Sequence, residues 1–432
     1  MKAIHISGIF VSILTLLASI AGAQEVGSAD LQAVQHASSG TTSLASLIEE
    51  ARAGNPQIQA ADHAYKAAAN VPKSAAALPD AQLTIQHLSV GSPRPFAGYT
   101  NSDFAYVGIG ASQEFPYPGK RKLRAEVAGR EADALQARTD ATSRDVVERV
   151  KAVYFHLSYT QQAIQLLQHH DQVLAEMQQI AESHYRVGQG NQQEVLKAQL
   201  QHTKILQEIA MSRRDEGQLE AQLKQLLDRA QDSPDILADP LIERRFAYSS
   251  SQLWQLAQTR NPDIHAQQAM LQQAQSQVAL ARKEFLPDFS LQYMYQNTDR
   301  KFRDYYLLTF GITLPNRGRR RAELAEASEK QARAQQDLRV ETQQQMAEIQ
   351  EQFVIVQNST EQLKIYKEGL IPQAATTFES ALAAYQANRQ DFQTLLSSFL
   401  DALDLNLQYQ RELADHESAL ARIEALTGMT LP

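Results

Sequence analysis

The chain presents one order of sequence features twice, about 200 residues apart. Each half contains an Asn-Pro, an Ala/Gln-rich stretch, a Leu-Pro-Asp, two alternating segments, a basic cluster with Pro and Gly, and a very long helical stretch. The paired motifs are Asn55-Pro56 with Asn261-Pro262, Leu78-Pro79-Asp80 with Leu286-Pro287-Asp288, and Phe115 through Arg121 with Leu314 through Arg320. A duplication of this size restricts the architecture, because neither half can bury its own strands.

The N-terminus has the layout of a secretory signal. Met1-Lys2 precedes an apolar run over residues 9–20 and the small residues Ala21-Gly22-Ala23. The run is too short to span a bilayer, and the small residues form an Ala-x-Ala cleavage site. We therefore expect a signal peptide over residues 1–23 and a flexible, polar segment over 24–42, with a retained N-terminal anchor as the alternative.

Composition excludes several classes of protein. The chain has no Cys, which removes lipid attachment at the mature N-terminus, disulfides and thiolate metal sites. Its formal charge of -8 argues against nucleic-acid binding, which usually needs a basic domain. No apolar run after residue 23 approaches the ~20 residues of a transmembrane helix. If this chain crosses a membrane, strands must do so.

Four segments alternate between apolar and polar residues, as strands with two different faces do. Two lie in the expected strand pair 80–115 of the first half and two in the pair 287–314 of the second. Each is about ten residues long, the length of a tilted strand that crosses a bilayer. Aromatic residues crowd the strand ends, as in an interfacial girdle: Phe104, Tyr106, Tyr293, Tyr295, Tyr305 and Tyr306. A half-buried soluble hairpin would alternate in the same way and stays open.

Long helical hairpins fill the remainder of each half. Residues 121–186 contain no Pro and only one Gly. Apolar residues recur there on steps of three and four, the spacing of a coiled-coil seam: Val146, Val150, Val153, Leu157, Ile164, Leu167, Leu174, Ala181 and Tyr185. We expect hairpins over 119–228 and 318–427, the second bent near Gly369 and Pro372. They belong to structural repeats over 43–230 and 251–428, joined by a connector over 231–250.

Four strands per chain cannot close into a barrel, and an open sheet edge in hydrocarbon costs several kcal/mol per unpaired backbone group. Closure must come from other copies, and three chains give the natural small solution. The predicted fold is therefore mainly α with a small β part. Three copies would share a twelve-stranded outer-membrane β-barrel above a periplasmic α-helical barrel.

At these residues the chain resembles the outer-membrane factor (TolC-like) family of efflux ducts. The resemblance covers about residues 44–428 and rests on the duplication, the strand pairs and the turns after Tyr185 and Tyr385. It implies a homotrimer in the outer membrane that docks a periplasmic adaptor (membrane fusion protein) and an inner-membrane pump of the resistance-nodulation-division type. The stretch from Ser112 to Arg121 looks most like members that accompany heavy-metal resistance pumps. Drug efflux and type I protein secretion remain open.

The resemblance also places function at the hairpin turns. In the family the turns form the periplasmic tip that contacts the adaptor and constricts the tunnel. The matching residues here are Tyr185, Arg186, Gly188, Gly190, Tyr385 and Asn388. Asn388 stands where Gly is usual, and Asn tolerates a positive φ.

Beyond these turns, family members often carry acidic residues. Here the second half has Thr394 and Ser397, and the first has Glu194. We expect either a ring of three symmetry-related Glu194 side chains at the constriction or local pairing of Glu194 with Lys197 or Lys204.

Basic clusters follow the second strand of each pair. They contain Lys120, Arg121, Lys122 and Arg124 in the first half, and Arg317, Arg319, Arg320 and Arg321 in the second. Positive charge in a first helical turn opposes the helix dipole, so helix stability does not explain the clusters. Contact with outer-membrane lipid phosphates is the favoured interpretation, and ordinary solvated charge is the alternative.

No sequence motif for an enzyme is present: there is no phosphate loop, metalloprotease helix or nucleophile elbow. No cofactor or metal site is expected, since adjacent His169 and His170 point about 100° apart on a helix. A periplasmic adaptor or a structural coiled-coil protein would also contain long helices. An adaptor has one hairpin with small β-domains, however, and a structural protein would not need four aromatic-edged strands.

Overall fold

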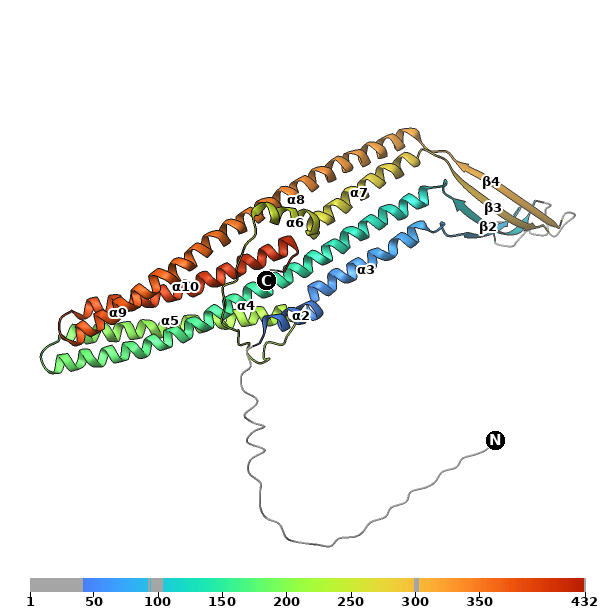
Figure 1. The fold of residues 1–432 in the computed structure, drawn as a ribbon. Helices are drawn as coiled ribbons and strands as arrows, with labels where there is room; N and C mark the ends of the chain where they lie inside the picture. The colour runs from blue at the N-terminus through green and yellow to red at the C-terminus, as the bar shows by residue number, and fades with distance from the viewer. Residues whose placement is uncertain (1–41, 92–93, 95–103, 299–302, 431–432) are drawn as a thin grey trace, which may run out of the picture. The chain divides into compact units, whose positions relative to one another are not determined.

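A computed structural model of the chain describes residues 42–91, 94, 104–298 and 303–430. The expected signal peptide, residues 24–41 and most of the two loops within the strand pairs lie outside the described residues. The unit from Thr42 onward contains long helices that run side by side and a sheet at one end of them (Figure 1).

Both halves of the chain have the same order of elements. The first contains α2 (Leu44–Gly54), α3 (Pro56–Ala76), β1 (Gln82–Leu88), β2 (Tyr106–Phe115), α4 (Lys120–Arg186) and α5 (Gln192–Leu226). The second contains α6 (Ser250–Arg260), α7 (Pro262–Lys283), β3 (Asp288–Asn297), β4 (Asp304–Thr313), α8 (Arg317–Ile365), the π-helical turn η1 (Tyr366–Leu370), α9 (Ile371–Gln386) and α10 (Phe392–Thr427). Strand β1 has seven residues, so the predicted length of about ten is wrong for this strand.

The Asn-Pro motifs separate helices instead of bending them. The stretch before the first strand pair is two helices, α2 and α3, because Asn55 adopts an extended conformation and caps α3. Its side chain accepts hydrogen bonds from the next helix and donates one to the carbonyl of Leu226 at 2.8 Å. Asn261 caps α7 and donates to the carbonyl of Leu426 at 3.0 Å. The duplication therefore extends to side-chain contacts that tie each short helix pair to the end of its hairpin.

The bend predicted near Gly369 and Pro372 coincides with η1. Proline lacks an N–H group and its ring crowds the carbonyl four residues earlier. The π-helical turn over residues 366–370 widens the helix immediately before Pro372. The helical hairpin of the second half therefore continues through three segments, α8, η1 and α9.

The four strands form one antiparallel sheet in the order β1-β2-β3-β4. Strand β2 of the first half pairs with β3 of the second, with Ile109 opposite Tyr295 and Phe115 opposite Phe289. Strands β1 and β4 lie at the two edges. The sheet is thus the place where the two halves are joined edge to edge.

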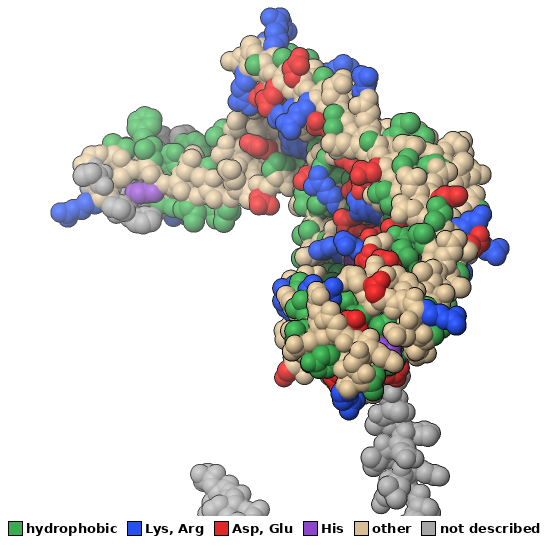
Figure 2. Space-filling view, turned by 90° about the vertical axis from the view of Figure 1, so that its left-hand side faces the viewer, with side chains coloured by type: hydrophobic (Ala, Val, Ile, Leu, Met, Phe, Trp, Pro, Cys, Tyr) green, Lys and Arg blue, Asp and Glu red, His purple; other side chains and the backbone are tan. Residues whose placement is uncertain are grey.

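The register puts mainly apolar side chains on one face of the sheet and mainly small or polar ones on the other, because strand side chains alternate. One face carries Leu83, Ile85, Ile109, Tyr293, Tyr295, Tyr306, Leu308, Phe310 and Ile312. The opposite face carries Gln82, Thr84, Gly108, Gly110, Ser112, Gln292, Gln296 and Thr309, together with Leu88, Tyr106, Met294, Tyr305 and Leu307. Figure 2 shows hydrophobic side chains gathered on the sheet and mixed charges on the helices.

The long helices bury the predicted seam. Val146, Val150, Leu157, Leu167, Leu174 and Ala181 are buried in α4, and Ala198, Ile205 and Leu223 in α5. Tyr185, the last predicted seam residue, is exposed, because the seam ends where the chain turns. Among the helices within the described part of the chain, none combines the length and sustained hydropathy needed to cross a bilayer.

Candidate functional site at the hairpin turns and the joint between the repeats

The two hairpin turns share one backbone conformation. Gly188 has φ 76° and Asn388 has φ 56°, so both lie in the left-handed region. The amide of Gln189 donates to the carbonyl of His184 at 2.8 Å, and that of Arg389 donates to the carbonyl of Ala384 at 2.9 Å. The prediction that Asn388 supports the same turn as a glycine is confirmed by this geometry.

Gly190 is needed for a different reason, because its backbone lies close to His184 and Tyr185 at the end of α4. A Cβ atom at this position would lie 3.0 Å from Cβ of His184 and 3.1 Å from the amide nitrogen of Tyr185. Arg186, Gly188 and Asn388 are exposed at the turns. These three predicted tip residues therefore face solvent in this structure.

The two turn tyrosines differ in environment. Tyr185 is 48% exposed, whereas Tyr385 is 3% exposed. The ring of Tyr385 lies between those of His184 and Phe392, with centroid distances of 5.0 and 5.5 Å. Its hydroxyl donates a hydrogen bond of 2.8 Å to Oε2 of Glu194. Burial and this bond to a carboxylate both raise the pKa of Tyr385, so the phenol stays protonated.

Glu194 thus connects the first turn to the second. It forms no ion pair with Lys197 or Lys204 within the described residues, so the expected local pairing is absent here. Lys197 instead donates to the side-chain oxygen of Gln393 at 2.5 Å, a second contact between the turns. The sequence could not reveal that Glu194 and Tyr385 meet, because they come from different halves of the chain.

Thr394 and Ser397 are exposed near the second turn. The amide of Thr394 donates to Oδ1 of Asp391 at 2.9 Å, which makes Asp391 the N-cap of α10. Asp391 is an exposed carboxylate at the turn that sequence reasoning did not single out. The sequence did contain a signal for Asp391, because an Asp three residues before Thr394 at the beginning of a helix is a typical N-cap.

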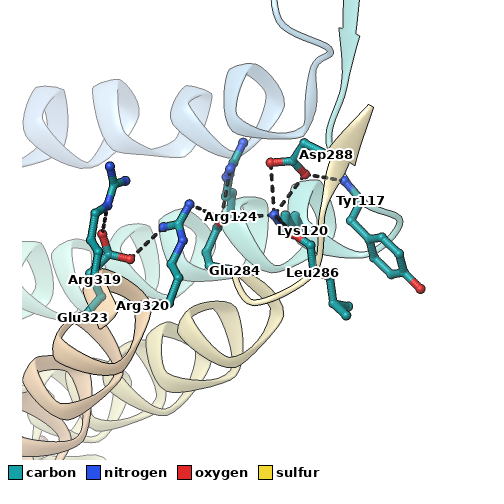
Figure 3. A network of polar contacts seen from close by, with 9 residues as sticks. All are labelled: Tyr117, Lys120, Arg124, Glu284, Leu286, Asp288, Arg319, Arg320 and Glu323. Carbon is teal, nitrogen blue, oxygen red and sulfur yellow. Dashed lines mark hydrogen bonds and ion pairs between the residues drawn. The ribbon is translucent and has the colours of Figure 1, made fainter. Parts of the chain in front are cut away.

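The basic cluster of the first half lies at the joint between the repeats, where strands lead into helices (Figure 3). Nζ of Lys120 is 2.9 Å from Oδ1 of Asp288 and 3.1 Å from Oε2 of Glu284, and it donates to the carbonyl of Leu286 at 2.9 Å. The Tyr117 amide donates to Oδ1 of Asp288 at 2.7 Å. The segment from Glu284 to Asp288, the first residue of β3, therefore holds the beginning of α4.

Lys120 is 1% exposed, and this burial corrects the prediction that it faces lipid phosphates. An ammonium group removed from water needs nearby carboxylates, and Glu284 and Asp288 provide them. Arg121 donates to the carbonyl of Ala76 at 2.7 Å, and Arg320 lies between Glu284 and Glu323. Arg319 is exposed and pairs with Glu323 on its own helix. Lipid contact stays a prediction for the exposed members of the clusters.

The His pair lies on α4 and does not converge. The rings of His169 and His170 are nearly perpendicular, with centroids 5.8 Å apart. Nδ1 of His170 is 3.0 Å from the carbonyl of Leu166, and burial lowers the pKa of His170. No group of three His, Asp or Glu side chains able to hold a metal ion occurs among the described residues.

The family model described as outer membrane efflux protein matches the sequence over residues 47–229 and again over 253–425. The chain belongs to the outer membrane efflux protein family. The two matched segments follow the duplication seen in the elements, each containing one strand pair and one helical hairpin. Proteins of this family are passive channels, which makes the chain a channel-family protein and not an enzyme.

Solved structures share the fold of this efflux protein. VceC from Vibrio cholerae is 18% identical, with 90% of this chain and 97% of that chain covered and a TM-score of 0.77. The MtrE outer membrane channel of Neisseria gonorrhoeae is 18% identical, covering 90% and 89%, with a TM-score of 0.75. CusC, a transmembrane channel, is 16% identical, covering 90% and 92%, with a TM-score of 0.76. A search of curated proteins finds no significant match.

Proposed function

We propose that three copies of this chain form an exit duct in the outer membrane, with the helices extending into the periplasm. The observation that carries the proposal is the four-stranded sheet, which has one apolar face and two edges without a partner strand in the described chain. An apolar face suits contact with lipid, and a polar face suits an aqueous channel. Neighbouring copies would pair the edges and remove the cost of unpaired backbone groups in hydrocarbon.

The helices support the same assembly. Large apolar side chains are exposed along α5 and α8, including Leu196, Leu200, Val340, Met346 and Val354. Soluble monomers rarely expose long rows of such residues. Adjacent copies in a ring would cover them by helix packing, as the sheet edges would be covered by strand pairing.

The duct would form the outer part of a tripartite efflux system. The exposed turn residues Tyr185, Arg186 and Asn388 form the surface that would contact a periplasmic adaptor, and a resistance-nodulation-division pump in the inner membrane would supply the energy. The cargo proposed is metal cations. This rests on the likeness of the stretch from Ser112 to Arg121 to ducts that accompany heavy-metal pumps.

Two measurements test the assembly. The protein purified in detergent is expected to have the mass of a trimer and to conduct ions in a planar bilayer. A water-soluble monomer that needs no detergent would contradict the proposal. For the cargo, a deletion strain should become sensitive to metal salts and not to a panel of drugs. The reverse pattern would assign the duct to drug efflux.

Glu194→Gln tests the turn as the constriction. The amide oxygen of Gln can still accept the hydrogen bond of Tyr385, so the fold is retained while three negative charges leave the proposed ring. We expect reduced cation selectivity of the reconstituted trimer. Unchanged selectivity would remove Glu194 from the constriction. Glu208→Gln, farther along α5, is the matched control, because Glu208 lies well away from the turn on the same helix.

A further inference from the structure

The structure contains one joint between a first and a second repeat, and a ring of copies would need a second kind of joint. Within the chain, the beginning of α4 meets the beginning of β3 through Lys120 and Asp288. By the duplicated motifs, Lys120 corresponds to Arg319 and Asp288 corresponds to Asp80. In the chain these two residues lie beside opposite edges of the sheet, so they cannot meet within one copy.

The correspondence between the two repeats also holds for strand pairing, in the register of β1 with β2 and of β3 with β4. In the first pair Leu83 is opposite Ala111. The duplicated motifs map these residues onto Leu291 and Phe310, which are opposite each other in the second pair. The alignment of motifs therefore converts the register of the first strand pair into the observed register of the second, without a shift by any residue.

The correspondence also holds for side chains at the joint. Arg121, at the beginning of α4, donates to the carbonyl of Ala76 at 2.7 Å. Their counterparts are Arg320 and Glu284, which form an ion pair at 3.4 Å. A contact made inside the first repeat thus recurs inside the second. The contact made between repeats, from Lys120 to Asp288, occurs once among the residues that the structure describes.

The two residues that correspond to Asp288 and Lys120, namely Asp80 and Arg319, are available to contact another copy of the chain. Asp80 is exposed and makes no hydrogen bond or ion pair within the described residues. The side chain of Arg319 is 67% exposed, and its one ion-pair partner in the described part of the chain is Glu323, four residues along its own helix, at 2.8 Å. A surface pair of this spacing contributes little and can be exchanged or extended at low cost.

We propose that Arg319 of one copy binds Asp80 of the next copy, which repeats the joint of Lys120 and Asp288 around the ring. The inference rests on the proposed trimer and specifies how its copies are joined. Each trimer would contain three joints of the first kind within chains and three of the second kind between chains.

The acidic residues around the two joints support this assignment. At the first joint Lys120 has Asp288 and also Glu284 as partners. The counterpart of Glu284 is Ala76, so the second joint lacks that carboxylate. The counterpart of Arg124 is Glu323, which supplies a carboxylate from the helix of Arg319 itself. Each cation would therefore have two carboxylates, although the second comes from a different position.

The same alignment of motifs also predicts how β4 of one copy would pair with β1 of the next, because β4 corresponds to β2 and β1 corresponds to β3. This predicted register places apolar side chains opposite each other. It places Ile312 of β4 opposite Leu83 of β1 in the next copy, and Phe310 opposite Ile85. All four side chains are exposed and belong to the apolar face of the sheet. A shift by one residue would bring that face against the polar one.

Cross-linking tests the proposal in the full chain, which has no native Cys. Asp80→Cys combined with Arg319→Cys, treated with a short bis-maleimide, should give covalently linked trimers on a denaturing gel. A reagent with a spacer is needed because an Arg–Asp pair separates the two backbones more than a disulfide can span. Asp80→Cys combined with Arg333→Cys is the matched control. Arg333 is an exposed arginine on the same helix, roughly 20 Å along it, and should not be linked.

A second cysteine pair separates this proposal from the proposed trimer. Leu83→Cys with Ile312→Cys should form disulfides between copies if the edges pair in the stated register. If this pair links copies and the Asp80–Arg319 pair does not, the ionic joint is wrong and the trimer stands. If neither pair links and the purified protein is a monomer, the proposed function fails as well. A trimer in which neither pair links overturns the joint and the register together.

Charge reversal gives a second readout. Asp80→Arg should lower the temperature at which the trimer dissociates in detergent, because it places a cation against Arg319. Asp80→Arg together with Arg319→Asp should restore part of that loss. Additive losses in the double variant would overturn the pairing.

Discussion

Helix α10 is buried along much of its length, whereas α5, its counterpart in the first half, is exposed over most of its surface. Leu413, Leu420 and Ile423 of α10 are at most 2% exposed, but Leu200 of α5 is 58% exposed. The reason is position: α10 packs against both α4 and α8, while α5 packs mainly against α4. The two hairpins share one backbone plan but differ in burial. Helix α10 forms the interior of the chain, and α5 leaves a surface that neighbouring copies could cover.

The same contrast occurs at the turns and at the joint. Tyr385 is buried and bonded to Glu194, whereas Tyr185 is exposed. Lys120 is buried between carboxylates, whereas its counterpart Arg319 is exposed. Internal duplication therefore preserves backbone geometry, while these two pairs of equivalent residues have different environments.

The largest effect is expected at the buried joint. Lys120→Met removes the ammonium partner of Asp288 and one of the three cations beside Glu284. It should cost about 3 kcal/mol of folding free energy, because it breaks a buried ion-pair network. Chemical unfolding of the detergent-solubilised protein measures this cost. Lys122→Met, an exposed lysine two residues away, is the control and should change stability by less than about 0.5 kcal/mol. Equal losses in both variants would show that the joint does not carry stability.

The turns provide the next comparison. Gly188→Ala forces a Cβ into the left-handed region and should cost about 1–2 kcal/mol. Asn388→Gly should be neutral or slightly stabilising, since Gly adopts the same φ without strain. Thermal unfolding of both variants checks the contrast. A destabilising Asn388→Gly would mean that the Asn side chain, not its backbone, matters at the second turn.

The turn tyrosines give a smaller difference. Tyr385→Phe removes the hydrogen bond to Glu194 and should cost about 1 kcal/mol. Because this bond connects the two turns, the reconstituted channel should also show more frequent open events. Tyr185→Phe should change neither quantity, since its hydroxyl makes no hydrogen bond within the described residues. Identical single-channel records for the two variants would contradict a role for the bond.

The smallest effect is confined to acid pH. His416 of α10 is fully buried, its Nδ1 is 2.7 Å from the hydroxyl of Ser359, and Glu417, Glu243 and Arg244 are its charged neighbours. Burial lowers the pKa of the imidazole, and the negative charge of Glu417 offsets part of this shift by raising the pKa. The unfolded chain, with a His pKa of about 6.5, then binds the proton more readily than the folded one. Stability is complete above that pH and falls as the pH drops through it toward the folded pKa.

His416→Asn should flatten the part of the stability profile that lies below about pH 6.5. His63→Asn, at an exposed position on α3, should leave the profile unchanged. Unfolding measured at several pH values distinguishes the two. The prediction is wrong if the slope persists without His416.

Much of the fold was predictable because the signals were local and duplicated. Alternation along β2, β3 and β4 and the seam from Val146 to Ala181 required only sequence spacing. The turn at Asn388 followed from the tolerance of Asn for positive φ. The break at Asn55 was less accessible, since an Asn-Pro can either bend a helix or cap a new one.

The partners of single charges were not predictable. Lys120 was assigned to lipid because its neighbours in sequence are basic, but its partners in space, Glu284 and Asp288, lie more than 160 residues away. Glu194 was weighed between a ring and nearby lysines, and its contact is Tyr385 of the other half. Local sequence cannot assign such contacts, because they depend on how the halves are packed.

The sequence by itself determined the duplicated plan, the two-faced strands and the helical hairpins, since periodicity and turn chemistry act over a few residues. Only the tertiary structure decided which duplicated residues are buried in one half and exposed in the other. Burial depends on neighbours from the other half, and those neighbours differ for α5 and α10, for Tyr185 and Tyr385, and for Lys120 and Arg319.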